Sequence, residues 1–128
     1  MENLKIEGTD RAPEVDFNFE NNTFALRGES YPEDITAFYG SVLDKLDEHL
    51  SSQNGATIRF DFELIYFNSS TAKVLMGLFE TLDEAAENGN EVLITWTFEA
   101  DDDNMEEMGE EFSEDLEHAK FEMKSIEE

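Results

Sequence analysis

The chain has 128 residues, of which 39% are hydrophobic, and this size and composition predict one folded domain over residues 1–128. Its 8 lysines and arginines stand against 33 acids, a net charge of −25 that argues against nucleic acid and membrane partners because both are anionic. The chain has no cysteine for disulfides and no apolar run near the ~20 residues of a membrane span, which together predict a cytoplasmic protein.

The first predicted elements are strands. Apolar residues alternate over residues 14–20 and again over 23–28. Asn21 and Asn22 lie between these runs and tolerate the positive φ of a tight turn, so the pattern predicts a β-hairpin. Residues 3–8 are expected to add an edge strand.

A helix is predicted next, over residues 31–50. Its apolar positions recur at helical spacing on one face: Ile35, Phe38, Tyr39, Val42, Leu46 and Leu50. Ser30 as N-cap with Glu33 three residues later matches a capping box, and Pro32 suits the first turn.

The second half alternates strands and helices. Residues 56–67 predict a strand, and the run Ile65, Tyr66, Phe67 predicts that both its faces become buried at its end. A helix follows from residue 72 with the apolar face Leu75, Met76, Phe79, Leu82 and Ala86, and then a strand over 91–100. A strand, helix, strand order implies parallel pairing.

The C-terminal region predicts a third helix and a weak terminal strand over residues 120–128. The helix follows the run of acids at 101–103 and carries Met105, Met108, Phe112 and Leu116. The fold class is therefore α/β: one domain with a mixed sheet of about five strands, an N-terminal hairpin and packed helices.

No catalytic, metal or cofactor motif emerges. Asp101 and Asp103 have the first spacing of an EF-hand loop, but Met105 occupies the place of the third oxygen ligand. His49 and His118 are isolated and fit surface positions better than metal sites. We therefore expect no enzyme, with a small divalent-metal enzyme built on the C-terminal carboxylates as the alternative from another class.

Three consecutive hydroxyls, Ser69, Ser70 and Thr71, stand where the strand pattern over 56–67 ends and the next helix begins. A helix start presents unpaired N–H groups and a partial positive charge, so a phosphate is tolerated there. Two interpretations remain open. Either Asn68 or Ser69 is a plain cap and the other hydroxyls are incidental, or one of the hydroxyls is a phosphorylation site.

Two stretches carry a resemblance to a known family. Residues 64–89, "LIYFNSSTAKVLMGLFETLDEAAENG", resemble the phosphorylatable segment of the SiaC-family regulatory phosphoproteins, which in turn resemble the STAS domains of anti-sigma-factor antagonists. Residues 27–40, "RGESYPEDITAFYG", are similar to the family's GxSYPE stretch. The similarity follows the order of nearly the whole chain.

The resemblance implies a partner-switching module without catalytic activity. A Ser/Thr kinase would phosphorylate the hydroxyl after Asn68, a PP2C-type phosphatase would remove the phosphate, and the unphosphorylated form would activate a diguanylate cyclase. Cyclic di-GMP and biofilm or aggregate formation would then rise. An anti-sigma-factor antagonist is the alternative, weakened because STAS antagonists usually carry Asp before the serine and Gly soon after it.

The resemblance also implies site residues. Ser69 is the expected acceptor, with Ser70 and Thr71 as rivals because the family pattern Asn-Thr-Ser-Ser is Asn-Ser-Ser-Thr here. The expected partner contacts are Asn68, Ser69, Ser70, Thr71, Lys73, Tyr31 and Pro32.

Overall fold

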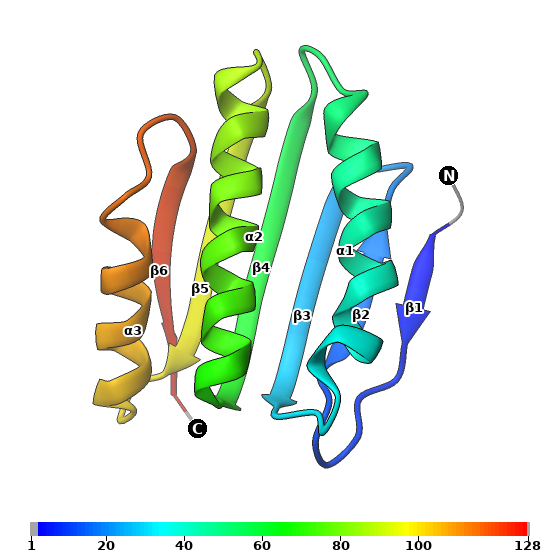
Figure 1. The fold of residues 1–128 in the computed structure, drawn as a ribbon. Helices are drawn as coiled ribbons and strands as arrows, with labels where there is room; N and C mark the ends of the chain where they lie inside the picture. The colour runs from blue at the N-terminus through cyan, green and yellow to red at the C-terminus, as the bar shows by residue number, and fades with distance from the viewer. Residues whose placement is uncertain (1–2, 128) are drawn as a thin grey trace.

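Strand order follows chain order across a six-stranded sheet in the computed structural model, which describes residues 3–127 (Figure 1). The elements are β1 (Leu4–Ile6), β2 (Glu14–Asn18), β3 (Thr23–Ser30), α1 (Ile35–Ser51), β4 (Thr57–Phe67), α2 (Ser69–Glu87), β5 (Glu91–Glu99), α3 (Asp103–Ser113) and β6 (Lys120–Ile126). The expected edge strand is β1, which brings the sheet to six strands where about five were predicted.

The sheet is mixed, as predicted. β1, β2 and β3 pair antiparallel, whereas β3, β4, β5 and β6 pair parallel, and each parallel step crosses over through a helix. All three crossover helices cover the same face of the sheet (Figure 1). This arrangement is expected, because each crossover adds its strand on the same side of the previous one and all the crossovers have the same handedness. Over residues 3–127 the structure has no helix with the length and apolarity of a membrane span.

The core lies between the sheet and the helices. Alternate residues of the strands are buried beneath the helices, and the largest of them are Phe17, Phe60, Phe62 and Trp96. Trp96 also fixes α3, because its indole N–H donates to the Met105 carbonyl at 2.9 Å and a Cβ on Gly109 would lie 2.5 Å from its ring. The opposite face of the sheet is polar.

The first helix begins later than predicted. Ser30 is the last residue of β3 and not a helix cap, and α1 starts at Ile35 instead of residue 31. The cap is Asp34, whose carboxylate accepts from the Ala37 N–H at 3.0 Å. Pro32 and Glu33 therefore belong to the linker. The capping-box prediction was wrong because pairing with β4 extends β3 through Ser30.

The end of β4 also differs from the prediction. Ile65 and Tyr66 are 57% and 52% exposed, so the two faces are not both buried there. Gly28 pairs with Leu64 and Glu29 pairs with Tyr66, which leaves Ile65 as the extra residue of a β-bulge. The bulge shifts the alternation by one residue. Phe67 is thereby buried against the helices and Tyr66 is exposed.

The apolar face of α2 is rotated slightly from the predicted one. Met76 is 53% exposed, whereas Leu78 and Ala85, which the prediction left out, are buried. Leu116, predicted on the third helix, lies beyond the end of α3. These differences leave one large apolar side chain of α2 on the surface next to α3.

Candidate functional site

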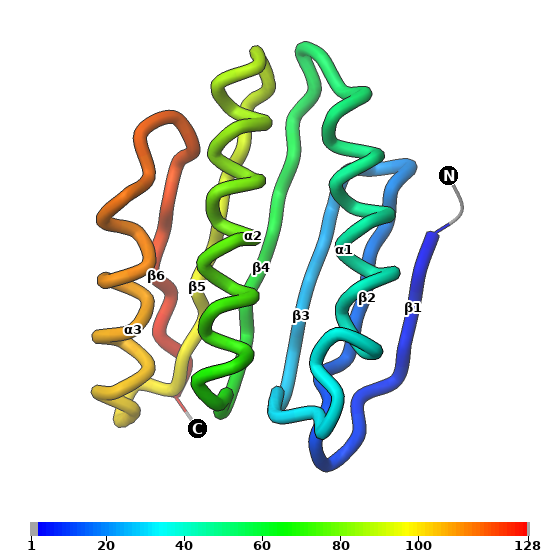
Figure 2. The backbone as a smooth tube through the Cα atoms, viewed as in Figure 1, coloured from blue at the N-terminus to red at the C-terminus, as the bar shows by residue number. Residues whose placement is uncertain are grey.

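The two stretches singled out in the sequence meet at one edge of the sheet. β3 and β4 are parallel neighbours that end side by side, and Ser30 pairs with Phe67 (Figure 2). The Asn68 N–H donates to the Ser30 carbonyl at 3.2 Å, which extends the pairing by one bond. The chain then starts α2 at Ser69. The hydroxyl-rich turn is therefore fixed by backbone bonds to the neighbouring strand.

Asn68 is the cap of α2. Its backbone is extended, with φ −90° and ψ 178°, and its side-chain oxygen accepts from the Thr71 N–H at 2.9 Å. Its carbonyl accepts from the Ala72 N–H at 2.9 Å, which is the first bond of the helix. Of the two caps considered from the sequence, Asn68 is the one that the structure uses, and no hydroxyl is needed for capping.

The three hydroxyls have different environments. Ser69 and Ser70 are exposed, and neither hydroxyl makes a hydrogen bond to another part of residues 3–127. Thr71 is completely buried. Its Oγ1 lies 3.0 Å from the Ser30 carbonyl, to which it donates, and 3.0 Å from the Ser30 hydroxyl. Two of the candidates are thus accessible from solvent and the third is part of the core.

Thr71 belongs to a buried chain of hydroxyls that joins both helices to β3. The Ser30 Oγ lies 2.6 Å from the Tyr39 hydroxyl of α1. One proton on each oxygen satisfies every bond if Tyr39 donates to Ser30, Ser30 donates to Thr71, and Thr71 donates to the Ser30 carbonyl. Burial raises the pKa of Tyr39 to about 12, although the Ser30 hydrogen bond works in the opposite direction. Tyr39 therefore stays a donor at neutral pH.

Sequence reasoning missed this chain of hydroxyls. Ser30 was predicted as a helix cap, and Tyr39 was predicted only as an apolar-face residue. Ser30 and Thr71 are 41 positions apart, and only the pairing of β3 with β4 brings them together. No local sequence signal marks that contact.

The local charge around α2's start contrasts with the rest of the chain. Residues 64–79 contain no Asp or Glu, the longest such stretch in the sequence. Asp34 and Asp102 cap α1 and α3 with carboxylates, whereas neutral Asn68 caps α2. Lys73 is exposed one turn after Ser69. The start of α2 therefore keeps its partial positive charge available for an anion.

The remaining expected contacts lie beside this turn. The Tyr31 N–H donates to the Arg11 carbonyl at 2.6 Å, and its ring packs edge-on against Tyr66 with centroids 5.7 Å apart. Pro32 is half-buried in the linker to α1. Lys73 lines a shallow hollow between α1 and α2. Tyr31 directly follows Ser30 of the last β3–β4 pair, and Ser69 directly follows Asn68, whose N–H donates to the Ser30 carbonyl, so the structure brings these stretches together.

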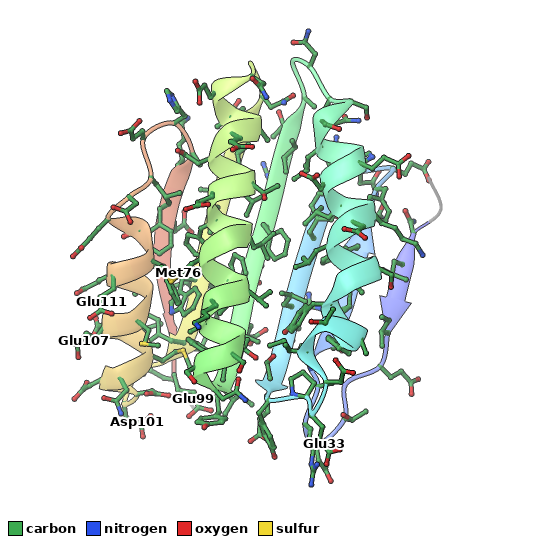
Figure 3. The ribbon with its side chains drawn as sticks, viewed as in Figure 1. Glu33, Met76, Glu99, Asp101, Glu107 and Glu111 are labelled. Carbon is green, nitrogen blue, oxygen red and sulfur yellow. The ribbon has the colours of Figure 1, made fainter. Side chains whose placement is uncertain are left out.

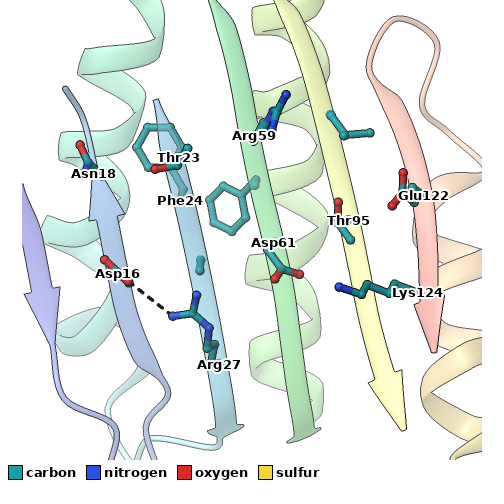
Figure 4. Close-up of a pocket in the computed structure, with 13 residues that line it drawn as sticks. Asp16, Asn18, Thr23, Phe24, Arg27, Arg59, Asp61, Thr95, Glu122 and Lys124 are labelled. Carbon is teal, nitrogen blue, oxygen red and sulfur yellow. Dashed lines mark hydrogen bonds and ion pairs between the residues drawn. The ribbon is translucent and has the colours of Figure 1, made fainter. Parts of the chain in front are cut away.

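The open face of the sheet holds a broad polar hollow (Figure 4). Two of its lining acids are engaged: Asp16 lies 3.5 Å from Arg27, which also lies 2.7 Å from Glu14, and Asp61 accepts from the Thr97 hydroxyl at 2.9 Å. Burial opposes the charge on Arg27, but the two carboxylates outweigh it and raise its pKa. Over residues 3–127 no group of three or more His, Asp or Glu side chains is arranged to hold a metal ion.

The two histidines lie apart from the hydroxyl-rich turn. His49 is partly buried, and its Nε2 lies 2.6 Å from the Asn22 side-chain oxygen. Burial lowers the pKa of His49. His118 is exposed, 3.8 Å from Glu87. Both are accounted for by ordinary structural contacts.

The fold and the site define a small α/β protein with two exposed serines at a neutral helix cap. The chain belongs to the SiaC family of regulatory phosphoproteins, whose family model matches residues 6–126. An uncharacterized protein of Pseudomonas aeruginosa (strain UCBPP-PA14) is 30% identical over 115 residues, covering 90% of each chain.

Solved structures give the same family. The crystal structure of apo-SiaC from Pseudomonas aeruginosa superposes with a TM-score of 0.87 at 30% identity, covering 98% of this chain and 100% of that one. SiaC in the crystal structure of diguanylate cyclase SiaD in complex with its activator SiaC, also from Pseudomonas aeruginosa, gives 0.85 at 27% identity, covering 94% of this chain and 98% of that one.

Proposed function

We propose that this chain is a cytoplasmic partner-switching protein that activates a diguanylate cyclase without catalysing a reaction itself. Its unphosphorylated form binds the cyclase, raises cyclic di-GMP and favours biofilm or aggregate formation. A Ser/Thr kinase phosphorylates Ser69 and releases the cyclase, and a PP2C-type phosphatase restores the active form.

One observation carries the cyclase part of the proposal. Nearly the whole chain superposes on a SiaC protein solved together with a diguanylate cyclase, and that SiaC is described as the activator of the enzyme. The match covers 94% of this chain and 98% of that one, so a partner surface of that protein has an equivalent here. Family membership over residues 6–126 supports the same conclusion.

Accessibility and position support Ser69 as the acceptor. Thr71 could receive a phosphate only if its bonds to Ser30 were broken and α2 were lifted from β3. Ser70 is exposed as well and remains the rival. Ser69 is favoured because it directly follows Asn68, as the resemblance implies, and because the first residue of α2 lies nearest the positive end of the helix dipole.

A phosphate at Ser69 would act on the partner rather than on the fold. It adds about −2 charge, and at the start of an exposed helix it is favoured by about 0.3–1 kcal/mol. The neighbouring surface is apolar, because Tyr31 packs on Tyr66 and Ile65 is exposed beside it. A partner that covers these side chains would have to desolvate the phosphate, which opposes binding.

Two measurements test the proposal together. Mass spectrometry after incubation with the cognate kinase and ATP should place the phosphate on Ser69, and Ser69→Ala should abolish its incorporation while Ser70→Ala and Thr71→Ser retain it. Ser69→Ala should still activate the cyclase. Phosphate on Ser70 in the unaltered chain would move the site by one residue, and loss of activation in Ser69→Ala would contradict the switch.

A further inference from the structure

A groove with an apolar floor runs between α2 and α3. Its floor is formed by Met76 and Phe79 of α2 and by Phe112 and Leu116. Phe79 is buried and its ring centroid lies 5.5 Å from that of Phe112, which closes the bottom of the groove. Met76 is 53% exposed and lies between the two helices (Figure 3). A large apolar side chain is therefore left facing solvent where two helices meet.

The rim of this groove is acidic on both sides. Glu80 and Asp83 of α2 line one side, and Glu111 and Asp115 line the other. Residues 74–119 contain no Lys or Arg, so no basic side chain from either wall neutralises this rim. Glu80, Glu111 and Asp115 are exposed and make no ion pair within residues 3–127.

Asp83 has a different role at the end of the groove. Its carboxylate accepts backbone N–H groups from Glu117, His118 and Ala119 at 2.8–3.3 Å. It thereby attaches the segment after α3 to α2 and fixes the width of the groove. Three rim carboxylates remain available to a partner, and they surround the exposed apolar floor.

We propose that the α2–α3 groove, defined by Met76, Phe79, Phe112 and Leu116 with the rim residues Glu80, Glu111 and Asp115, binds a basic amphipathic helix of a partner protein. Charge complementarity selects this occupant. An apolar side chain on one face of the helix covers Met76 and Phe112, and Lys or Arg side chains beside it pair with the rim carboxylates, as in other helix-in-groove complexes.

The size of the groove and its distance from Ser69 follow from helix geometry. On α2 the groove lining extends from Met76 to Asp83, which is about 10 Å along the helix and matches about two turns of a partner helix. Met76 lies seven residues after Ser69, which is about 10 Å along α2. The groove is thus a second surface on the same helix, and occupancy of the groove does not require the Ser69 hydroxyl.

A synthetic peptide tests this surface directly. The probe is a fluorescein-labelled helical peptide of about 14 residues with Leu at i, i+3, i+4 and i+7 and Lys elsewhere, compared with a scrambled peptide of the same composition that has no apolar face. Fluorescence anisotropy at physiological ionic strength should show that the amphipathic peptide binds at least about tenfold more tightly than the scrambled one.

Matched charge variants separate the groove from the general attraction of a −25 protein. The triple variant Glu80→Gln, Glu111→Gln, Asp115→Asn should weaken binding of the amphipathic peptide about tenfold. The control variant Asp44→Asn, Asp47→Asn, Glu48→Gln removes three charges from α1, away from the groove, and should change binding less than about twofold.

An apolar pair completes the test. Met76→Ser should weaken the amphipathic peptide, whereas Ile65→Ser, which removes an equally exposed side chain outside the groove, should not. Equal losses in the two charge triples, equal affinity of the scrambled peptide, or unchanged binding in Met76→Ser would each overturn the proposal. Ser69→Asp should leave peptide binding unchanged, so failure of the phosphorylation switch and failure of the groove are distinguishable.

Discussion

The starts of α1 and α2 occupy equivalent places in the fold but differ in charge. Each helix follows one of two parallel neighbours, β3 or β4, at the same edge of the sheet. α1 starts after a linker and is capped by the carboxylate of Asp34, whereas α2 starts directly after β4 and is capped by the neutral amide of Asn68. At α1 the Asp34 carboxylate already lies at the positive end of the helix dipole. At α2 no negative charge from residues 3–127 lies there, so an added anion would be stabilised.

The largest expected effect comes from placing a fixed charge at each start. Ser69→Asp should weaken binding to the cyclase about 100-fold or more, because the charge enters the proposed partner surface. Thr36→Asp puts the same charge on an exposed residue in the first turn of α1 and should change binding less than about twofold. Titration calorimetry measures both. Equal effects of the two substitutions would remove the distinction between the helix starts.

The next effect concerns the buried hydrogen bonds by which Ser30 of β3 connects Tyr39 of α1 to Thr71 of α2. Thr71→Val should reduce the free energy of unfolding by about 1–3 kcal/mol, because the buried Ser30 hydroxyl loses its acceptor and the Ser30 carbonyl keeps only the bond from the Asn68 N–H. Ser70→Ala, at an exposed position, should cost less than about 0.5 kcal/mol. Urea unfolding gives both values. A Thr71→Val protein as stable as the original would show that the hydroxyl chain does not join the two helices.

The Asp83 carboxylate accepts hydrogen bonds from three backbone N–H groups. These bonds should make the free energy of unfolding depend on pH. Burial alone would raise the pKa of Asp83, but the bonds from Ala119, His118 and Glu117 outweigh it and lower the pKa. Its contribution to stability is therefore complete above the unfolded value of about 3.9 and is lost as the pH falls through the lower folded value.

Asp83→Asn measures that contribution. It should reduce the free energy of unfolding at pH 7 by about 1 kcal/mol or less, since the carboxylate is only partly buried. The difference from the unaltered chain should shrink as the pH falls below about 4. Urea unfolding between pH 3 and pH 7 provides the check. A difference in the free energy of unfolding that stays constant with pH would mean that the negative charge of Asp83 does not contribute to stability.

The smallest expected effect comes from placing a negative charge at the start of α2, where α1 already has the Asp34 carboxylate. Phosphorylation of Ser69 should raise the free energy of unfolding of the isolated domain by about 0.3–1 kcal/mol, because the phosphate meets an unneutralised helix start. In Asn68→Asp the cap already carries a charge, and the same phosphate should give no gain. Thermal unfolding of phosphorylated and unphosphorylated forms tests this, and equal gains in both backgrounds would contradict it.

The sequence predicted most of the fold because its period changes are strong. The alternation over residues 56–67 and 91–100 and the helical spacing between them identified β4, α2 and β5 and their parallel order. Errors occurred at boundaries where tertiary pairing decides. Ser30 satisfied the local pattern of a helix cap, but the β3–β4 ladder holds it in the sheet.

The candidate site was predictable only where its features are local in the sequence. Asn68 and the exposed serines are local features, and a helix start can be read from residue types alone. The burial of Thr71 depends on Ser30 and Tyr39, and the exposure of Tyr66 depends on the bulge opposite Gly28. The α2–α3 groove depends on how α3 packs on Trp96, which no sequence period encodes.

Cyclase activity measured against phosphate occupancy tests the central claim most directly. The chain is prepared unphosphorylated, phosphorylated by its kinase to a stoichiometry verified by mass spectrometry, and phosphorylated then treated with a PP2C-type phosphatase. Cyclic di-GMP formation by the cognate cyclase should be high with the first and third preparations and at the basal rate with the second. Full activation by a chain carrying one phosphate on Ser69 would contradict the account.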